Sequence, residues 1–165
     1  MLSDKLQSAL NEQMRSEFYS SYLYLGMAAH FESGELGGIA SLLRAQAAEE
    51  TQHAHKFFDY LCQAGARPRL GTIEAVPSEY GSALTAFRLA LEHERKVSAQ
   101  IHALMDLAIS ERNHASVAFL QWFVTEQVEE EATFGRFVRR LEMLGDDPRG
   151  LLMFDREMAA RAAGH

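Results

Sequence analysis

The sequence carries one decisive stretch, Glu49-Glu50-Thr51-Gln52-His53, in the middle of a helical run at about 39–64. Glu50 falls on the apolar stripe of that run when core positions are stepped by ~3.5 residues, the rhythm of packed antiparallel helices. His53 lies one turn further along, beside the same stripe. A single acidic residue of this kind is most often part of a solvated helix face. Whether Glu50 has a functional role therefore depends on which other side chains the fold places at the same level of the bundle.

Breaks rich in glycine and proline divide the chain into four long helices and one short one. The predicted helices cover about residues 4–33, 39–64, 82–111, 114–144 and 151–163. The connection from Gly65 to Gly81 contains two prolines and no helical period. Fully extended at ~3.3 Å per residue it reaches ~50 Å, enough to run along a helix of about 30 residues, which is ~45 Å long. We therefore predict one all-α domain over residues 1–165, a four-helix bundle with a long crossover between parallel second and third helices and a short C-terminal helix.

The composition and charge exclude several classes of protein. Of the 165 residues, 47% are hydrophobic and 24% charged, as in soluble globular proteins rather than disordered or fibrous ones. The formal net charge of −7 and the lack of a basic stripe predict cations, not nucleic acid, as partners. No apolar run is long enough to cross a bilayer and no secretory signal is evident, so we expect no membrane contact and a cytoplasmic location. The single cysteine, Cys62, is expected to be a small buried hydrophobe.

Each long helix carries a carboxylate on its largely apolar core stripe, and the fourth helix adds a polar neighbour. These residues are Glu17, Glu50, Glu94, Gln127 and Glu130. At ~1.5 Å per residue, and with the directions that the crossover imposes, the four carboxylates lie ~20–26 Å above the same end of the bundle. Burying them together costs on the order of several kcal/mol per ion unless cations compensate. Oxygen-rich ligands with one imidazole suit iron or manganese, and also zinc, so the sequence predicts a metal centre.

At these residues the chain resembles the ferritin family, in particular the bacterial non-haem ferritins. The resemblance runs from Asn11-Glu12-Gln13-Met14 through the Glu49–His53 stretch and Phe119-Leu120-Gln121-Trp122 to the short last helix. It implies a di-iron ferroxidase centre in which Glu50 bridges two iron ions. The implied ligands are Glu17, Glu50 and His53 for the first iron and Glu50, Glu94 and Glu130 for the second.

The resemblance also implies roles for residues around the pair. Gln127 stands at the position beside the second iron, and Tyr24 matches a tyrosine next to the ligands. A third iron site is implied for Glu49, Glu126 and Glu129 together with Glu130. From the residues alone, Glu126 and Glu129 are an ordinary solvated acidic face.

Two departures argue against a bacterioferritin. The fourth helix has Gln127-x-x-Glu130 where many di-iron proteins have a second Glu-x-x-His. The methionine that holds haem in bacterioferritins, immediately after the bridging glutamate, is Thr51 here. We therefore expect iron as the cofactor and no haem.

The function that the resemblance implies is oxidation of Fe(II) with O2 or hydrogen peroxide and storage of ferric oxyhydroxide inside a homo-oligomeric shell of 24 subunits. A rubrerythrin-like peroxidase or a substrate oxidase could use the same scaffold, although one cysteine cannot supply the cysteine-rich iron domain of a rubrerythrin. A structural or partner-binding bundle without metal is the other alternative.

The remaining aromatic and histidine residues have simpler interpretations. Trp122 lies beside the ligand-bearing part of the fourth helix and is expected to pack in the core, with a redox role as the alternative. The other histidines show no partners at ligand spacing and are predicted to lie at the surface or to be satisfied locally. They are His30, His55, His93, His102, His114 and His165.

Overall fold

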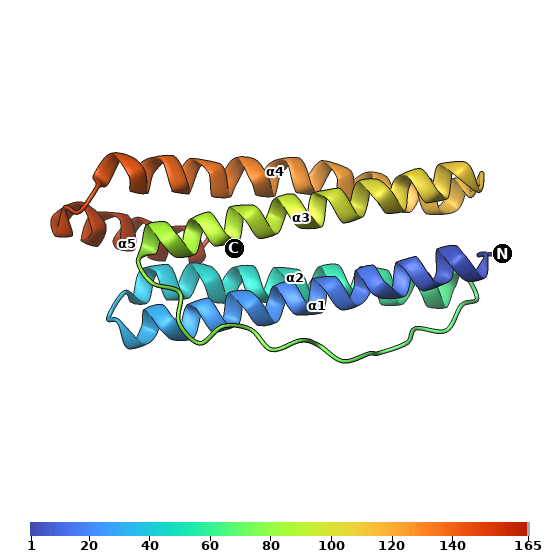
Figure 1. Cartoon of the computed structure of the whole chain (residues 1–165), viewed down its shortest axis with the longest axis horizontal. Helices are drawn as coiled ribbons and strands as arrows, with labels where there is room; N and C mark the ends of the chain where they lie inside the picture. Colours follow the sequence, from blue (N-terminus) through green and yellow to red (C-terminus); the bar gives the residue numbers. More distant parts are fainter. Residues whose placement is uncertain (165) are drawn as a thin grey trace.

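The computed structural model describes residues 1–164, which form five helices and no strand. The helices are α1 (Asp4–Ser33), α2 (Gly37–Gln63), α3 (Ala83–Ser110), α4 (His114–Leu144) and α5 (Pro148–Ala162). The four long helices lie side by side as two pairs, α1 with α2 and α3 with α4 (Figure 1). This arrangement confirms the predicted all-α bundle.

The segment between α2 and α3 runs as an extended chain along the length of the bundle, beside α1 (Figure 1). Near its start, the backbone N–H of Arg69 donates to Oδ1 of Asn11 at 2.5 Å. Near its end, Nε2 of His30 lies 2.9 Å from the carbonyl oxygen of Gly81. Helix α1 therefore holds both ends of the crossover, which makes α2 and α3 parallel as the linker length predicts.

Helix α5 folds back onto α2. Carboxylate Oδ1 of Asp155 accepts a hydrogen bond of 2.8 Å from the backbone N–H of Ile39, so α5 caps the first turn of α2, whose own N-cap residue makes no side-chain bond. Gly38 permits the approach, because a Cβ there would lie 1.8 Å from the carbonyl oxygen of Asp155.

The last helix begins earlier than the sequence analysis predicts. It starts at Pro148 rather than at residue 151, and the side chain of Asp147 accepts the N–H of Arg149 at 3.0 Å. Proline is well tolerated in the first turn of a helix, where its missing N–H has no helical partner. The break between residues 144 and 151 therefore includes a start signal, Asp147-Pro148, and the turn is confined to Gly145, with φ 56°, and Asp146.

The buried apolar side chains form two clusters on either side of a layer of buried polar residues. On α1, Met14 belongs to one cluster and Leu23 to the other, and Glu17 lies between them. The buried polar residues at this level are Glu17, Ser20, Glu50, His53, Glu94, Ser98, Gln127 and Glu130. The fold thus places a polar layer in the middle of an otherwise apolar core.

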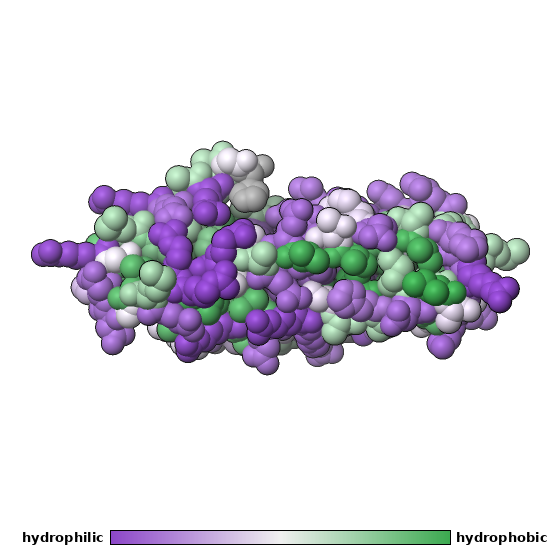
Figure 2. All heavy atoms as spheres, turned by 90° about the horizontal axis from the view of Figure 1, so that it is seen from above, coloured by the Kyte–Doolittle hydropathy of each residue, from purple (hydrophilic) through white to green (hydrophobic). Residues whose placement is uncertain are grey.

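Two surface features complete the description. Cys62 is exposed near the end of α2, so the prediction that it is buried is wrong; its position falls off the apolar stripe of that helix. Seen from the α4 side, hydrophobic residues form a row toward the end where α3 and α4 are joined (Figure 2). None of the helices within residues 1–164 is both long and apolar enough to span a bilayer.

Candidate metal centre

Helices α1 and α2 together supply one compact group of metal-binding side chains. Glu17, Glu50 and His53 each place one ligand atom so that all three atoms lie within 4.8 Å of one another. The i, i+3 spacing on α2 brings Nδ1 of His53 to 3.1 Å from Oε2 of Glu50. All three side chains are buried, with exposed fractions of 1 to 3%. Two carboxylates and an imidazole in this arrangement can hold one metal ion.

Helices α3 and α4 bring Glu94 and Glu130 to the same level. The hydroxyl of Tyr24 donates to Oε1 of Glu94, and the amide Nε2 of Gln127 donates to Oε2 of Glu94 at 3.0 Å. Both oxygens of Glu94 therefore accept a hydrogen bond. The amide Nε2 of Gln46 donates to Oε1 of Glu130 at 3.0 Å.

The second half of the centre is less compact than the first. Within residues 1–164, Glu94 and Glu130 do not join a group of three ligand atoms as close as that of Glu17, Glu50 and His53. Glu50 nevertheless faces both, since the charges of Glu94 and Glu130 act on it directly. The structure thus brings all the expected di-iron residues into one buried layer.

Burial raises the pKa of every carboxyl group in this layer. Loss of hydration is the largest cause for each, and repulsion between neighbouring carboxylates adds to it for Glu17 and Glu50. For Glu94, the bonds from Tyr24 and Gln127 offset part of the rise in pKa. Burial and the charge of Glu94 raise the pKa of Glu130 to about 8. A divalent cation bound here would replace protons on these groups.

Tyr24 is fixed between the carboxylates and the core. Its ring stacks on Phe134 with a centroid distance of 5.5 Å and an interplanar angle of 8°. Burial, followed by the charge of Glu94, raises the pKa of its phenol. The hydroxyl therefore keeps its proton and donates a hydrogen bond to Glu94. Tyr24 therefore orients Glu94 within the layer.

A further acidic group lies beside the first one. Glu49, His53 and Glu126 place ligand atoms within 4.8 Å of one another. Partial burial raises the pKa of Glu126, and the charges of Glu49 and Glu129 add to that rise. Glu129 is exposed and does not belong to the compact group. The structure therefore brings together two of the three auxiliary carboxylates, with His53 as their shared neighbour.

Comparison with known proteins decides the family. A sequence profile of the ferritin family, described as a ferritin-like domain, matches residues 7–144. The chain belongs to the ferritin family.

Full-length relatives agree with this assignment. The ferritin is 39% identical over 162 residues to a protein of Staphylococcus epidermidis named bacterial non-heme ferritin, with 98% of each chain covered. It is 40% identical over 161 residues to a protein of the same name from Bacteroides fragilis, covering 98% of this chain and 100% of that one. A solved structure described as an open pore ferritin from Archaeoglobus fulgidus is 44% identical with a TM-score of 0.95, over 96% of this chain and 98% of that one. The predicted fold class and family are confirmed.

Trp122 does not pack in the core of this ferritin as predicted. Its side chain is 40% exposed, and its ring meets that of His53 edge-on at a centroid distance of 5.3 Å. Nζ of Lys56 lies 4.2 Å above the indole. The indole thus covers the imidazole from the surface side, whereas the buried face of that part of α4 is occupied by Phe123. Whether Trp122 takes part in redox chemistry stays a hypothesis.

Among the described residues, no histidine other than His53 belongs to the groups of close ligand atoms. His93 lies 2.8 Å from Oγ of Ser20, and burial lowers its pKa to about 4, so the ring is neutral. His30 contacts the crossover as described above. His55, His102 and His114 are exposed, and His165 lies outside the described residues.

Two glutamines of the ferritin that the sequence did not single out, Gln13 and Gln46, also contact the centre. Each lies four residues before a glutamate of the centre, a spacing that places the two side chains on one helix face. The amide of Gln13 donates to Oε1 of Glu17 at 2.8 Å. That spacing is the sequence signal that could have identified both residues.

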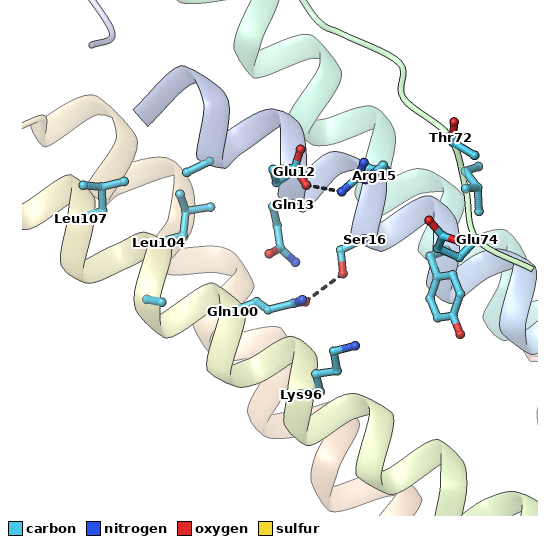
Figure 3. A pocket seen from close by; sticks show the side chains of 14 residues that line it. Glu12, Gln13, Arg15, Ser16, Thr72, Glu74, Lys96, Gln100, Leu104 and Leu107 are labelled. Atoms are coloured by element: carbon cyan, nitrogen blue, oxygen red, sulfur yellow. Dashed lines mark hydrogen bonds and ion pairs between the residues drawn. The ribbon is translucent and has the colours of Figure 1, made fainter. Parts of the chain in front are cut away.

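Gln13 also lines a surface cavity of about 620 Å³ between α1, α3 and the crossover. Figure 3 shows the side chains of this cavity, with a hydrogen bond of 2.8 Å from Ser16 to Gln100 joining α1 to α3. Gln13 therefore borders the cavity and also contacts Glu17 of the first metal-binding group through its buried amide.

Proposed function

We propose that this ferritin oxidises Fe(II) to Fe(III) at the paired centre and stores the product as ferric mineral. The observation that carries the proposal is the close approach of Glu17, Glu50 and His53, in one buried layer with Glu94 and Glu130. The names of the relatives, bacterial non-heme ferritins, support it.

Glu50 is suited to hold two Fe(II) ions at once. Its Oε2 faces His53, and its Oε1 faces the side of Gln46 and Glu130. One ion would be held by Glu17, Glu50 and His53, and the other by Glu50, Glu94 and Glu130. Anionic ligands in a buried layer favour the more highly charged Fe(III) over Fe(II). The pair can therefore deliver two electrons together: two Fe(II), O2 and two protons give two Fe(III) and hydrogen peroxide.

The surrounding residues keep the ligands in place. Tyr24 and Gln127 fix the two oxygens of Glu94, and Gln13 fixes Glu17. Because the pKa values of the carboxyl groups are raised, binding of Fe(II) releases protons within the layer. Such protons are available to the reduced oxygen.

The acidic group beside the pair is proposed as a third iron site. Glu49 and Glu126 approach one another at His53, and Glu129 and Glu130 follow on the next turn of α4. Iron leaving the pair would pass these carboxylates next. Copies of the chain, 24 in our proposal, would enclose the cavity in which the mineral forms, in the cytoplasm and without haem, membrane or nucleic acid.

Aerobic iron loading tests the proposal against a bundle without metal. Protein stripped of metal is mixed with Fe(II) in air and separated by size-exclusion chromatography with detection of protein and iron. We expect iron in large excess over subunits to elute with a shell-sized assembly. Iron eluting apart from the protein, or only in the void volume as free precipitate, would contradict iron storage.

A further inference from the structure

Gln46 joins the two halves of the helix bundle at the level of the candidate centre. It lies half-buried on α2, one turn before Glu50. Its amide nitrogen is 3.0 Å from Oε1 of Glu130 on α4 and 3.4 Å from Oε1 of Glu50. A single amide thus contacts two carboxylates that belong to different helix pairs.

We propose that Gln46 is a positioning residue that holds Glu130 next to Glu50, and so presets the second half of the metal centre. The inference rests on the proposed function, which makes Glu50 and Glu130 ligands of the same ion. It assigns Gln46 a role in binding that ion without direct contact to it.

The need for such a residue follows from charge and flexibility. The charge of Glu94 acts on Glu130, and Glu49 adds to the repulsion. A glutamate has three rotatable bonds, and the acidic side chain immediately before Glu130 on α4, Glu129, is exposed. Without a donor on the inner side, repulsion favours rotation of the ionised Glu130, the form that binds a cation, away from the layer. A neutral amide supplies the donor and adds no positive charge that would repel a cation.

Gln46 contacts only one carboxylate oxygen of each glutamate, so its contacts are compatible with metal binding. The closer bond of Gln46 occupies only Oε1 of Glu130, and Oε2 stays free to bind an ion. The contact with Glu50 is longer, on the oxygen opposite the one that faces His53. Partners that hold the ligands of a metal in this way typically contribute ~10–100-fold to its affinity.

Gln13 provides an internal comparison. Its amide donates to Glu17 alone, at 2.8 Å, and both residues belong to α1. Loss of this amide affects a ligand of the first ion only. We therefore expect opposite effects on metal affinity: loss of Gln46 should weaken binding of the second ion, and loss of Gln13 binding of the first.

The test uses the full-length protein with three methionine variants. Methionine keeps the length of glutamine and removes the amide. Gln46→Met and Gln13→Met are compared with Gln52→Met, at an exposed position on the same helix as Gln46. Protein stripped of metal is titrated by calorimetry, with Fe(II) under anaerobic conditions and separately with Zn(II), which has no redox chemistry. Circular dichroism verifies helix content, and Gln46→Ala, too small to clash, repeats the measurement.

We expect Gln46→Met to weaken binding of the second ion about 10-fold and to leave the first unchanged. Gln13→Met should weaken the first ion, and Gln52→Met neither. Crystals of Gln46→Met soaked in Zn(II) should show Glu130 turned out of the layer. Equal or tighter binding of the second ion in both Gln46 variants would overturn the inference, because the amide would then be neutral or a competitor. Failure of the unmodified protein to bind two ions per subunit would instead contradict the proposed function.

Discussion

At the scale of single residues, the two oxygens of Glu50 face different partners. Oε2 lies 3.1 Å from Nδ1 of His53, whereas Oε1 lies on the side of Gln46 and Glu130. Glu50 is therefore the residue whose loss should affect both ions.

Replacement of this glutamate gives the first prediction. Glu50→Ala deletes the ligand shared by both ions, so the initial rate of Fe(II) oxidation should fall by more than the ~10–100-fold that loss of an outer partner costs. Stopped-flow absorbance of the ferric product measures this rate. Glu12→Ala, an exposed position on α1, serves as the control. Rapid oxidation by Glu50→Ala at the unmodified rate would contradict the assignment.

The raised pKa of Glu130 predicts how stability depends on pH. Its pKa is about 8 in the folded chain against an ordinary value of 4.5, so across this window the folded state holds a proton that the unfolded state has lost. Stability without bound metal therefore falls as the pH rises from 4.5 to about 8. In Glu130→Gln this contribution is absent.

Thermal unfolding in the presence of a chelator measures the effect. The melting temperature of Glu130→Gln should fall less across that pH window than the melting temperature of the unmodified protein. Glu142→Gln, a half-exposed position on the same helix, should follow the unmodified protein. An equal decrease for all three proteins would show that Glu130 ionises normally.

The buried acids of the candidate centre, and by their spacing the neighbouring glutamines, could be predicted from the sequence, but the contacts that join the two helix pairs could not. Glu17, Glu50 and Glu94 stand out because an acid on an apolar stripe is unusual, and their level follows from helix geometry. Gln46 gives no such contrast, since a glutamine at the edge of a helix stripe is ordinary. Its contact with Glu130 depends on the distance between α2 and α4, which only the structure supplies.

At the scale of elements, α5 stabilises the start of α2. The bond from Ile39 to Asp155 replaces the missing N-cap, and Gly38 lets the two backbones approach. The residues Gly37-Gly38 look like a simple break in the sequence. Their role as a docking point for a helix more than 100 residues away could not be predicted from local patterns.

A substitution at Gly38 tests the docking of α5 on α2. In Gly38→Ala the new Cβ would collide with the backbone of Asp155, so α5 must shift, at a cost of about 1–3 kcal/mol. Hydrogen exchange of α5 should become faster, while exchange in the middle of α3 should be unchanged. Gly37→Ala, where a Cβ meets nothing within 4 Å, is the matched control. Unchanged protection of α5 in Gly38→Ala would show that the helix packs elsewhere in solution.

At the scale of the whole molecule, the polar layer divides the core into two apolar clusters. The crossover makes this possible, because it fixes the directions in which α2 and α3 run (Figure 1). Those directions set the level at which Glu50 and Glu94 lie near one another. The length of the linker predicted that topology. The predicted burial of Cys62 and Trp122 is wrong, because each lies one residue from a core position, Leu61 and Phe123, and so off the apolar stripe of its helix.

The acidic group outside the pair gives a prediction about transport through the molecule. Combined replacement of Glu49, Glu126 and Glu129 by alanine removes the auxiliary carboxylates but none of the proposed ligands of the pair. Oxidation of a first addition of two Fe(II) per subunit should stay fast, whereas repeated additions should be oxidised more slowly as iron fails to leave. Stopped-flow absorbance over successive additions compares the two phases. Loss of the first fast phase would show that the pair and the auxiliary group are one site. If both phases match those of the unmodified protein, the auxiliary carboxylates are only a solvated surface.

Anomalous diffraction from crystals soaked anaerobically in Fe(II) shows where the metal ions bind in each subunit. We predict two iron peaks in each subunit, one in contact with Glu17 and His53 and the other with Glu94 and Glu130. Glu50 should lie between them and contact both. A single peak, or peaks that do not contact Glu50, would contradict a paired iron centre in this ferritin.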